Sequence, residues 1–162
     1  MLLKRVFSAS SLSLRRAFGT TSSSVETYKV TASSNPQGDT SYISGKTNSE
    51  NKIGKPLETI LAALSGCENT TACYYAKTLD IEIRNMSFQV EADYDTVRFH
   101  SVGEPNIFSQ IRMNVEVDTD GTQEDVDKLR DAVAKHSPIQ NMLSMSGVDI
   151  QSNWIKKKKQ QH

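Results

Sequence analysis

The sequence is poor in the residues that mark several classes of protein. Two cysteines in 162 residues are too few for a disulfide scaffold, and 19 basic residues are balanced by 19 acidic ones. No apolar run approaches the roughly 18 residues that a membrane-spanning helix needs. We therefore predict neither a nucleic-acid partner nor a membrane partner. With 36% hydrophobic residues, the chain has the length and composition of one soluble globular domain with a tail.

Acidic side chains are absent from the first 25 residues, and the first one in the chain is Glu26. This segment contains seven serines and the basic residues Lys4, Arg5, Arg15 and Arg16. Such a start is typical of an organelle-import presequence, and the stretch from Arg16 to Gly19 resembles a matrix-protease cleavage site. We expect residues 1–18 to be a mitochondrial targeting presequence and the mature protein to lie in the mitochondrial matrix. A disordered extension without a targeting role is the alternative.

After the presequence we predict a linker at 19–24, one domain at 25–155 and a basic polar tail at 156–162. Apolar spacing predicts, in order, strands near 28–32 and 42–43, a long helix at 56–79, strands at 81–94 and 111–117, helices ending near His136 and Gly147, and a strand at 148–154. The alternating pattern shifts register at Arg84-Asn85, which predicts a bulge or a short turn. Residues 93–106 are expected to connect two strands as a hairpin. This order predicts an α+β fold with mainly antiparallel pairing.

Cys67 is the first candidate for chemistry. It lies three residues after Leu64 and seven after Ile60, so helical spacing places it in the buried stripe of the long helix. A small residue that fills a tight helix crossing is therefore one interpretation. The neighbouring Gly66 costs about 0.5–1 kcal/mol in mid-helix, which favours close approach of another backbone or of a ligand. A reactive thiol would also need nearby positive charge or hydrogen-bond donors.

Two motifs resemble a known family. The segment from Pro56 to Cys67, with Ile60-Leu61-Ala62-Ala63-Leu64-Ser65-Gly66-Cys67, resembles the central-helix signature of the OsmC/Ohr family, the osmotically inducible protein C and organic hydroperoxide resistance proteins. The segment 134–143 resembles the family's second motif. The resemblance implies antiparallel sheets wrapped around long central helices in an intertwined homodimer. It also implies thiol-dependent reduction of organic hydroperoxides, with no cofactor.

By position, the resemblance makes Cys67 the peroxide-attacking cysteine and Glu58 an acidic residue of the site. Ser137 stands where the family has its second, resolving cysteine, and a serine cannot form the disulfide that reduces a sulfenic acid. The family also places an arginine from an early strand beside the thiolate. This chain has no arginine between Arg16 and Arg84, so that role is unfilled or passes to Lys46, Lys52 or Lys55.

Structural interpretations stand beside these assignments. Glu58 lies nine residues before Cys67, about half a turn around and some ~13 Å along one helix, so it would act by holding a cation, by reaching a partner subunit's thiol, or only on the helix dipole. Ser137 also suits the N-cap of a helix with proline in its first position. Cys73 is about 9 Å of helix rise from Cys67, too far for a disulfide, and is expected to pack.

The histidines give weaker signals. His136 precedes Ser137 and suits either pairing with a thiolate or a capping or surface role. The residues Cys67, Cys73, His100 and His136 show no recognised ligand spacing, so we predict no metal.

Two hypotheses follow from the sequence. The first is a thiol-dependent peroxidase that uses Cys67 alone and an external thiol or dithiol reductant. The second is a non-catalytic or small-ligand-binding protein that keeps the fold while the redox site has degenerated. Loss of the second cysteine and of the early arginine favours the second hypothesis, and the presence of Glu58 together with Cys67 favours the first.

Overall fold

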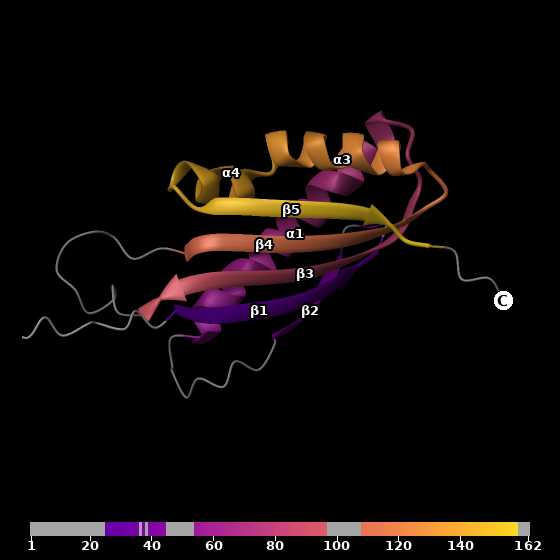
Figure 1. Cartoon of the computed structure of the whole chain (residues 1–162). Coiled ribbons are helices and arrows are strands. Elements are labelled where there is room, and N and C mark those ends of the chain that lie inside the picture. The colour runs from indigo at the N-terminus through magenta and orange to yellow at the C-terminus, as the bar shows by residue number, and fades with distance from the viewer. Residues whose placement is uncertain (1–24, 36, 38, 45–53, 97–107, 159–162) are drawn as a thin grey trace, which may run out of the picture.

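A computed structural model describes residues 25–35, 37, 39–44, 54–96 and 108–158. Its strands form one five-stranded sheet in the order β2-β1-β3-β4-β5 (Figure 1). The strands are β1 (Val25–Ser34), β2 (Thr40–Ser44), β3 (Ile83–Asp95), β4 (Phe108–Thr119) and β5 (Asp149–Lys156). Three pairings are antiparallel, whereas β4 and β5 run parallel. The α+β fold and the order of elements predicted from the sequence are therefore confirmed.

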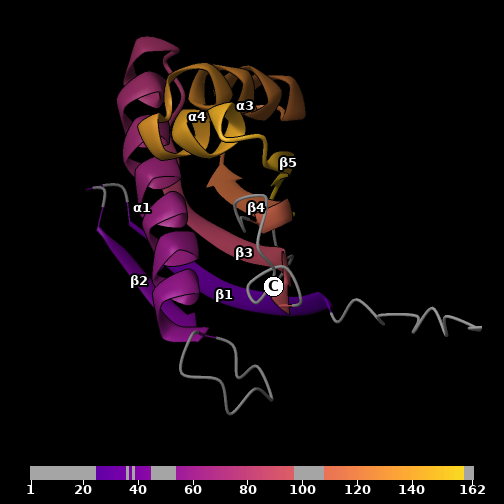
Figure 2. The ribbon, with the colours of Figure 1, turned by 90° about the vertical axis from the view of Figure 1, so that its left-hand side faces the viewer.

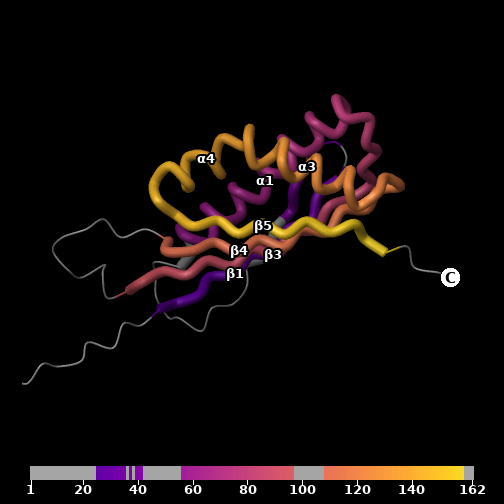
Figure 3. The backbone as a smooth tube through the Cα atoms, turned by 45° about the horizontal axis from the view of Figure 1, so that its top comes forward, coloured from indigo at the N-terminus to yellow at the C-terminus, as the bar shows by residue number. Residues whose placement is uncertain are grey.

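Three helices lie on one face of this sheet (Figures 1 and 3). They are α1 (Gly54–Thr78), α3 (Gln123–His136) and α4 (Pro138–Met145). The long helix α1 packs against β1, β2 and β3, and α3 and α4 lie alongside it (Figure 2). No helix in the described ranges is long and apolar enough to cross a membrane.

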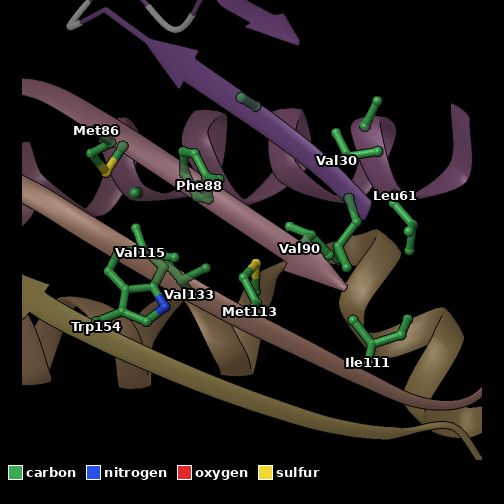
Figure 4. Packing of buried hydrophobic residues seen from close by; sticks show 14 of the residues in the cluster. Val30, Leu61, Met86, Phe88, Val90, Ile111, Met113, Val115, Val133 and Trp154 are labelled. Atoms are coloured by element: carbon green, nitrogen blue, oxygen red, sulfur yellow. The ribbon is translucent and has the colours of Figure 1, made fainter. Parts of the chain in front are cut away.

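The core forms between the helices and the sheet because the strands alternate. In β3, Met86, Phe88 and Val90 face the helices and are at most 1% exposed, while the residues between them are more accessible. Val115 on β4 and Trp154 on β5 continue the same layer, and Figure 4 shows them packed together. The Trp154 ring meets Phe88 edge-on, with ring centroids 6.4 Å apart. The apolar alternation thus fixes which face of the sheet carries the helices.

Two expectations about the sheet are confirmed. The register shift predicted at Arg84-Asn85 is present, because the pairing of β3 with β4 is irregular between Ile83 and Asn85. The pairing of the described strands is mainly antiparallel, as predicted, and β5 is the exception. Because α3 and α4 carry the chain from the end of β4 back to the level of its start, β5 adds to β4 in parallel.

Several predicted segments lie outside the described residues. These are the presequence (1–18), the linker (19–24), residues 97–106 of the predicted hairpin connection and the end of the basic tail (159–162). The described strand β3 extends to Asp95, and β5 ends at Lys156. The domain bounds of 25–155 remain a prediction.

Candidate functional site

Cys67 lies in the middle of α1 and is only half-buried. The buried side of α1 is formed instead by Leu61, Leu64, Glu68 and Ala72, each at most 1% exposed. Ile60, which spacing had placed in the buried stripe, is 39% exposed. The expectation that Cys67 belongs to the fully buried stripe is therefore wrong. Its thiol stands at the edge of the packed face, within reach of solvent.

The side chain of Ser137 meets this thiol. Ser137 is the residue between α3 and α4, it is fully buried, and its hydroxyl donates a hydrogen bond to the sulfur of Cys67 over 3.4 Å. Ser137 occupies the N-cap position of α4 with Pro138 behind it, as predicted, but its side chain makes no capping hydrogen bond. The hydroxyl donates its hydrogen bond to the Cys67 sulfur instead. A donor at this distance stabilises a thiolate more than a neutral thiol.

Glu68 is a residue of the site that the sequence reasoning missed. It follows Cys67 on α1, is 1% exposed, and its Oε1 has no hydrogen-bond partner. Burial raises the pKa of its carboxyl to about 7, although hydrogen bonding with Ser137 opposes part of that rise. The signal that could have found it is its spacing, since it lies seven residues after Leu61 and four after Leu64.

Glu58 lies near the N-terminal end of the same helix. It is buried at 8% exposure, and its charge contributes to the raised pKa of Tyr28 on β1. That pKa is raised to about 12, first by burial and then by the hydrogen bond that the Tyr28 hydroxyl donates to Glu26 over 2.8 Å. Nine helical residues separate Glu58 from Cys67, about 13 Å along the axis. The role of Glu58 in the site therefore stays a prediction.

The second cysteine is a free thiol that packs beside the core. The sulfur of Cys73 donates towards Asn69 Oδ1 over 3.6 Å and lies 3.9 Å from the carbonyl oxygen of Asn35. Burial raises the pKa of this thiol, and the nearby Lys77 lowers it only in part. Cys73 is therefore less easily ionised than an ordinary thiol.

The remaining candidates are partly outside the described residues. His136 stacks on Tyr75, with ring centroids 4.7 Å apart and an interplanar angle of 22°. His100, Lys46 and Lys52 lie outside the described ranges. Among the residues that the structure does describe, no group of three or more His, Cys, Asp or Glu side chains is placed to hold a metal ion.

Gly66 has open space on its side of the helix. A Cβ at this position would meet nothing within 4 Å. Close approach of another backbone of the same chain, one of the two reasons that the sequence suggested for this glycine, is therefore not found among the described residues.

A sequence model described as OsmC-like protein matches residues 49–153, well over half of the chain. The fold is similar to an OsmC-like protein from Mycoplasma pneumoniae, with a TM-score of 0.58, 22% identity, and coverage of 81% of this chain and 97% of that one. It is also similar to an OsmC-like hydroperoxide resistance protein from Jannaschia sp. CCS1, with a TM-score of 0.57, 14% identity, and coverage of 74% and 87%. No curated protein sequence matches. The chain belongs to the OsmC-like protein family.

Proposed function

We propose that this protein is a thiol-dependent peroxidase that reduces organic hydroperoxides through Cys67. The thiolate attacks the distal oxygen of the hydroperoxide, an S–O bond forms and the O–O bond breaks. The products are a sulfenic acid on Cys67 and an alkoxide, which takes up a proton to leave as the alcohol. Two external thiols, or one dithiol, then return the sulfenic acid to the thiol and release water and a disulfide.

The observation that carries this proposal is the environment of the Cys67 sulfur. A half-buried thiol with a buried hydroxyl donor at 3.4 Å combines access for a substrate with stabilisation of the thiolate. Membership of the OsmC-like family supports the same activity. The hydroperoxide resistance activity in the name of the Jannaschia protein belongs to a protein of similar fold and low identity, and it agrees with the proposal.

The reductant in this proposal is external because Ser137 supplies no second thiol. Its oxygen can hydrogen-bond to the sulfenic acid but cannot form a disulfide with it. A small thiol such as glutathione, or a dihydrolipoyl group, has the chemistry to resolve the sulfenic acid.

The second candidate is a non-catalytic or ligand-binding member of the family. The observation that favours it is the same hydroxyl at Ser137, since a protein without a resolving thiol has lost one step of the usual cycle. The two candidates differ in one measurable property, which is the rate at which Cys67 reacts with a hydroperoxide.

The test is stopped-flow mixing of residues 19–162 with cumene hydroperoxide, followed by dimedone trapping of the sulfenic acid. We expect a dimedone adduct on Cys67, no adduct in Cys67→Ser, and an unchanged rate in the matched control Cys73→Ser. Oxidation no faster than that of free cysteine, with no adduct on Cys67, would leave the ligand-binding candidate.

We further propose that the protein works as an intertwined homodimer in the mitochondrial matrix. The acid-free, Arg- and Ser-rich segment 1–18 supports the location, and sequencing the N-terminus of the protein from purified mitochondria tests it. A mature chain that begins near Gly19 is expected, and an intact residue 1 in the matrix would contradict the proposal. In the dimer, Glu58 would act by holding a cation or by reaching the thiol of the partner subunit.

A further inference from the structure

The hydroxyl of Ser137 has two neighbours that compete for its single proton. One is the sulfur of Cys67, to which it donates over 3.4 Å, and the other is the carboxyl group of Glu68, with which it also interacts. A serine hydroxyl has one proton to donate and two lone pairs that accept. The direction of the Ser137 proton therefore depends on whether Glu68 presents a carboxylate or a protonated carboxyl.

The surroundings of Glu68 make both the protonated and the ionised form of its carboxyl group accessible near neutral pH. It is 1% exposed and its Oε1 has no hydrogen-bond partner, so the ionised form is poorly solvated. Burial raises the pKa of the carboxyl to about 7. A neutral carboxyl also carries an O–H donor, which a carboxylate lacks.

The elements packed against α1 supply no described counter-ion that holds Glu68 ionised. The buried side chains of β1, β3, α3 and α4 carry no charge, and the titratable ones among them are Tyr28 and Tyr94. The Tyr28 hydroxyl is bonded to Glu26. The titratable groups that α1 itself brings to this side or its edge are Glu58, Cys67, Cys73 and Tyr75, and His136 of α3 is stacked on Tyr75.

We propose that Glu68 is a positioning residue of the Cys67 site, acting through Ser137. When Glu68 is protonated, it donates to Ser137 Oγ, and the Ser137 hydroxyl donates to the sulfur of Cys67. When Glu68 is ionised, its carboxylate accepts the hydrogen bond from the Ser137 hydroxyl, and the sulfur loses that donor. This inference rests on the proposed function only in taking Cys67 as the reacting thiol.

The sign of the effect follows from charge. Ionised Glu68 places a negative charge beside Cys67 and withdraws a donor, and both changes disfavour the thiolate. Ionisation of Glu68 therefore opposes the gain in reactivity that rising pH brings to any thiol. Replacing Glu68 by glutamine keeps the size and an N–H donor but removes the ionisation.

The experiment measures the rate of Cys67 alkylation by iodoacetamide as a function of pH. All variants carry Cys73→Ser, so that Cys67 is the chain's remaining thiol. We expect Glu68→Gln to match the parent below about pH 6 and to exceed it by about tenfold at about pH 8. We also expect the parent profile to require two ionisations and the Glu68→Gln profile one. A loosened variant would instead react faster than the parent at every pH, including below about pH 6.

Ser137→Ala is the second variant, and it keeps the test decisive if Glu68→Gln does not fold. Without the hydroxyl, alkylation below about pH 6 should slow by about tenfold, because the thiolate loses the donor that neutral Glu68 directs to it. The matched control is Ser65→Ala, which removes a buried hydroxyl of α1 that donates to the carbonyl oxygen of Leu61 over 3.0 Å. Its profile should coincide with the parent's.

The proposal is overturned if Glu68→Gln follows the parent profile at every pH, or if it is slower throughout. An unchanged low-pH rate in Ser137→Ala overturns it equally. Because the assay contains no hydroperoxide, a protein that shows the expected profiles but fails to reduce cumene hydroperoxide would count against the proposed function and not against the role of Glu68.

Discussion

The Ser137 hydroxyl stands where a second thiol would be able to reach Cys67. Its oxygen lies 3.4 Å from the sulfur, and the two residues come from α1 and from the junction of α3 with α4. A disulfide needs sulfur atoms about 2 Å apart and Cα atoms within about 7 Å. A sulfur in place of the Ser137 oxygen would need only a small adjustment to meet that condition.

We therefore predict that Ser137→Cys forms a disulfide with Cys67 on mild oxidation. Non-reducing mass spectrometry after digestion should find a peptide pair that joins positions 67 and 137, in a Cys73→Ser background. Ser65→Cys is the control, because the Ser65 side chain points to the carbonyl oxygen of Leu61 on its own helix. If only intermolecular disulfides formed in Ser137→Cys, the assignment of position 137 as the resolving position would be wrong.

Glu68 should make the stability of the protein fall as pH rises. Its pKa moves from the ordinary 4.5 to about 7 on folding, so the fold favours the protonated form. That stabilisation is complete below about pH 4.5 and is lost as pH rises through about 7, an effect on the order of 3 kcal/mol. Urea unfolding at about pH 5 and pH 8 should show Glu68→Gln gaining stability relative to the parent as pH rises.

The control for this measurement is Ser65→Ala, which changes a buried but non-titrating side chain. Its difference in unfolding free energy from the parent should be equal at the two pH values. A Glu68→Gln difference that was likewise independent of pH would show that Glu68 does not titrate in this range.

Sequence reasoning found Cys67 and Ser137 but not the contact of Glu68 with them. The first two were named through motif resemblance, because residues 70 positions apart offer no spacing rule that joins them. Glu68 was overlooked because a glutamate in a helix is normally solvated. Its spacing from Leu61 and Leu64 indicates the covered side of the helix, and the packing of α3 and α4 on α1 shows that it lies there.

At the level of the element, α3 is the part of the fold that local sequence determines best. Thr122 Oγ1 accepts a hydrogen bond from the backbone N–H of Asp125 over 3.2 Å, and Asp125 Oδ2 accepts one from the backbone N–H of Thr122 over 2.8 Å. The two residues thus form a reciprocal capping box, for which a threonine followed three residues later by an acidic residue is the local signal. Val126, Leu129 and Val133 then form the buried side of the helix.

The Thr122 cap should contribute measurably to the stability of α3. Thr122→Ala should lower the free energy of unfolding by about 1 kcal/mol, because one helix N–H loses its acceptor. Thr122→Ser keeps the hydroxyl and should cost clearly less. Urea denaturation of the three proteins measures both values, and equal losses in Ala and Ser variants would mean that the methyl group of Thr122, rather than the cap, stabilises α3.

The direction of β5 could not be predicted in the same way. Alternation of apolar residues around Trp154 identifies a strand and its buried face, but it is the same for parallel and antiparallel neighbours. The direction depends on where α3 and α4 bring the chain back to the sheet. That is a property of helix packing across the whole layer, and local spacing does not contain it.

On the scale of the whole molecule, one side of α1 is left uncovered by the parts of the chain that the structure describes. Ile60, Ala63, Thr70 and Tyr74 recur at intervals of three, seven and four residues along it, and all four are exposed. Tyr74 is 68% exposed, and a Cβ on Gly66 would have open space. Cys67 lies in the same stripe, midway between Ala63 and Thr70. A large apolar side chain in such a row is typical of an interface.

We predict that this stripe of α1 contacts the second copy in the proposed homodimer. Analytical ultracentrifugation should find a dimer for the parent and a monomer, or a dimer weakened by several kcal/mol, for Tyr74→Glu, because a carboxylate buried without a partner is strongly unfavourable. Ile155→Glu is the control, since Ile155 is 42% exposed and alternates with the buried Trp154 on the other face of the sheet.

Because Cys67 lies in this stripe, formation of the dimer should change the accessibility of its thiol, and this gives a stricter test. If the second copy covers α1 beside Cys67, the alkylation rate of Cys67 must change as the parent protein is diluted through its dimer dissociation constant. Tyr74→Glu must then show, at every concentration, the rate measured for the fully diluted parent. A rate that stays constant across that dilution, while the mass falls from dimer to monomer, would place the interface elsewhere. The site would then be complete within one chain.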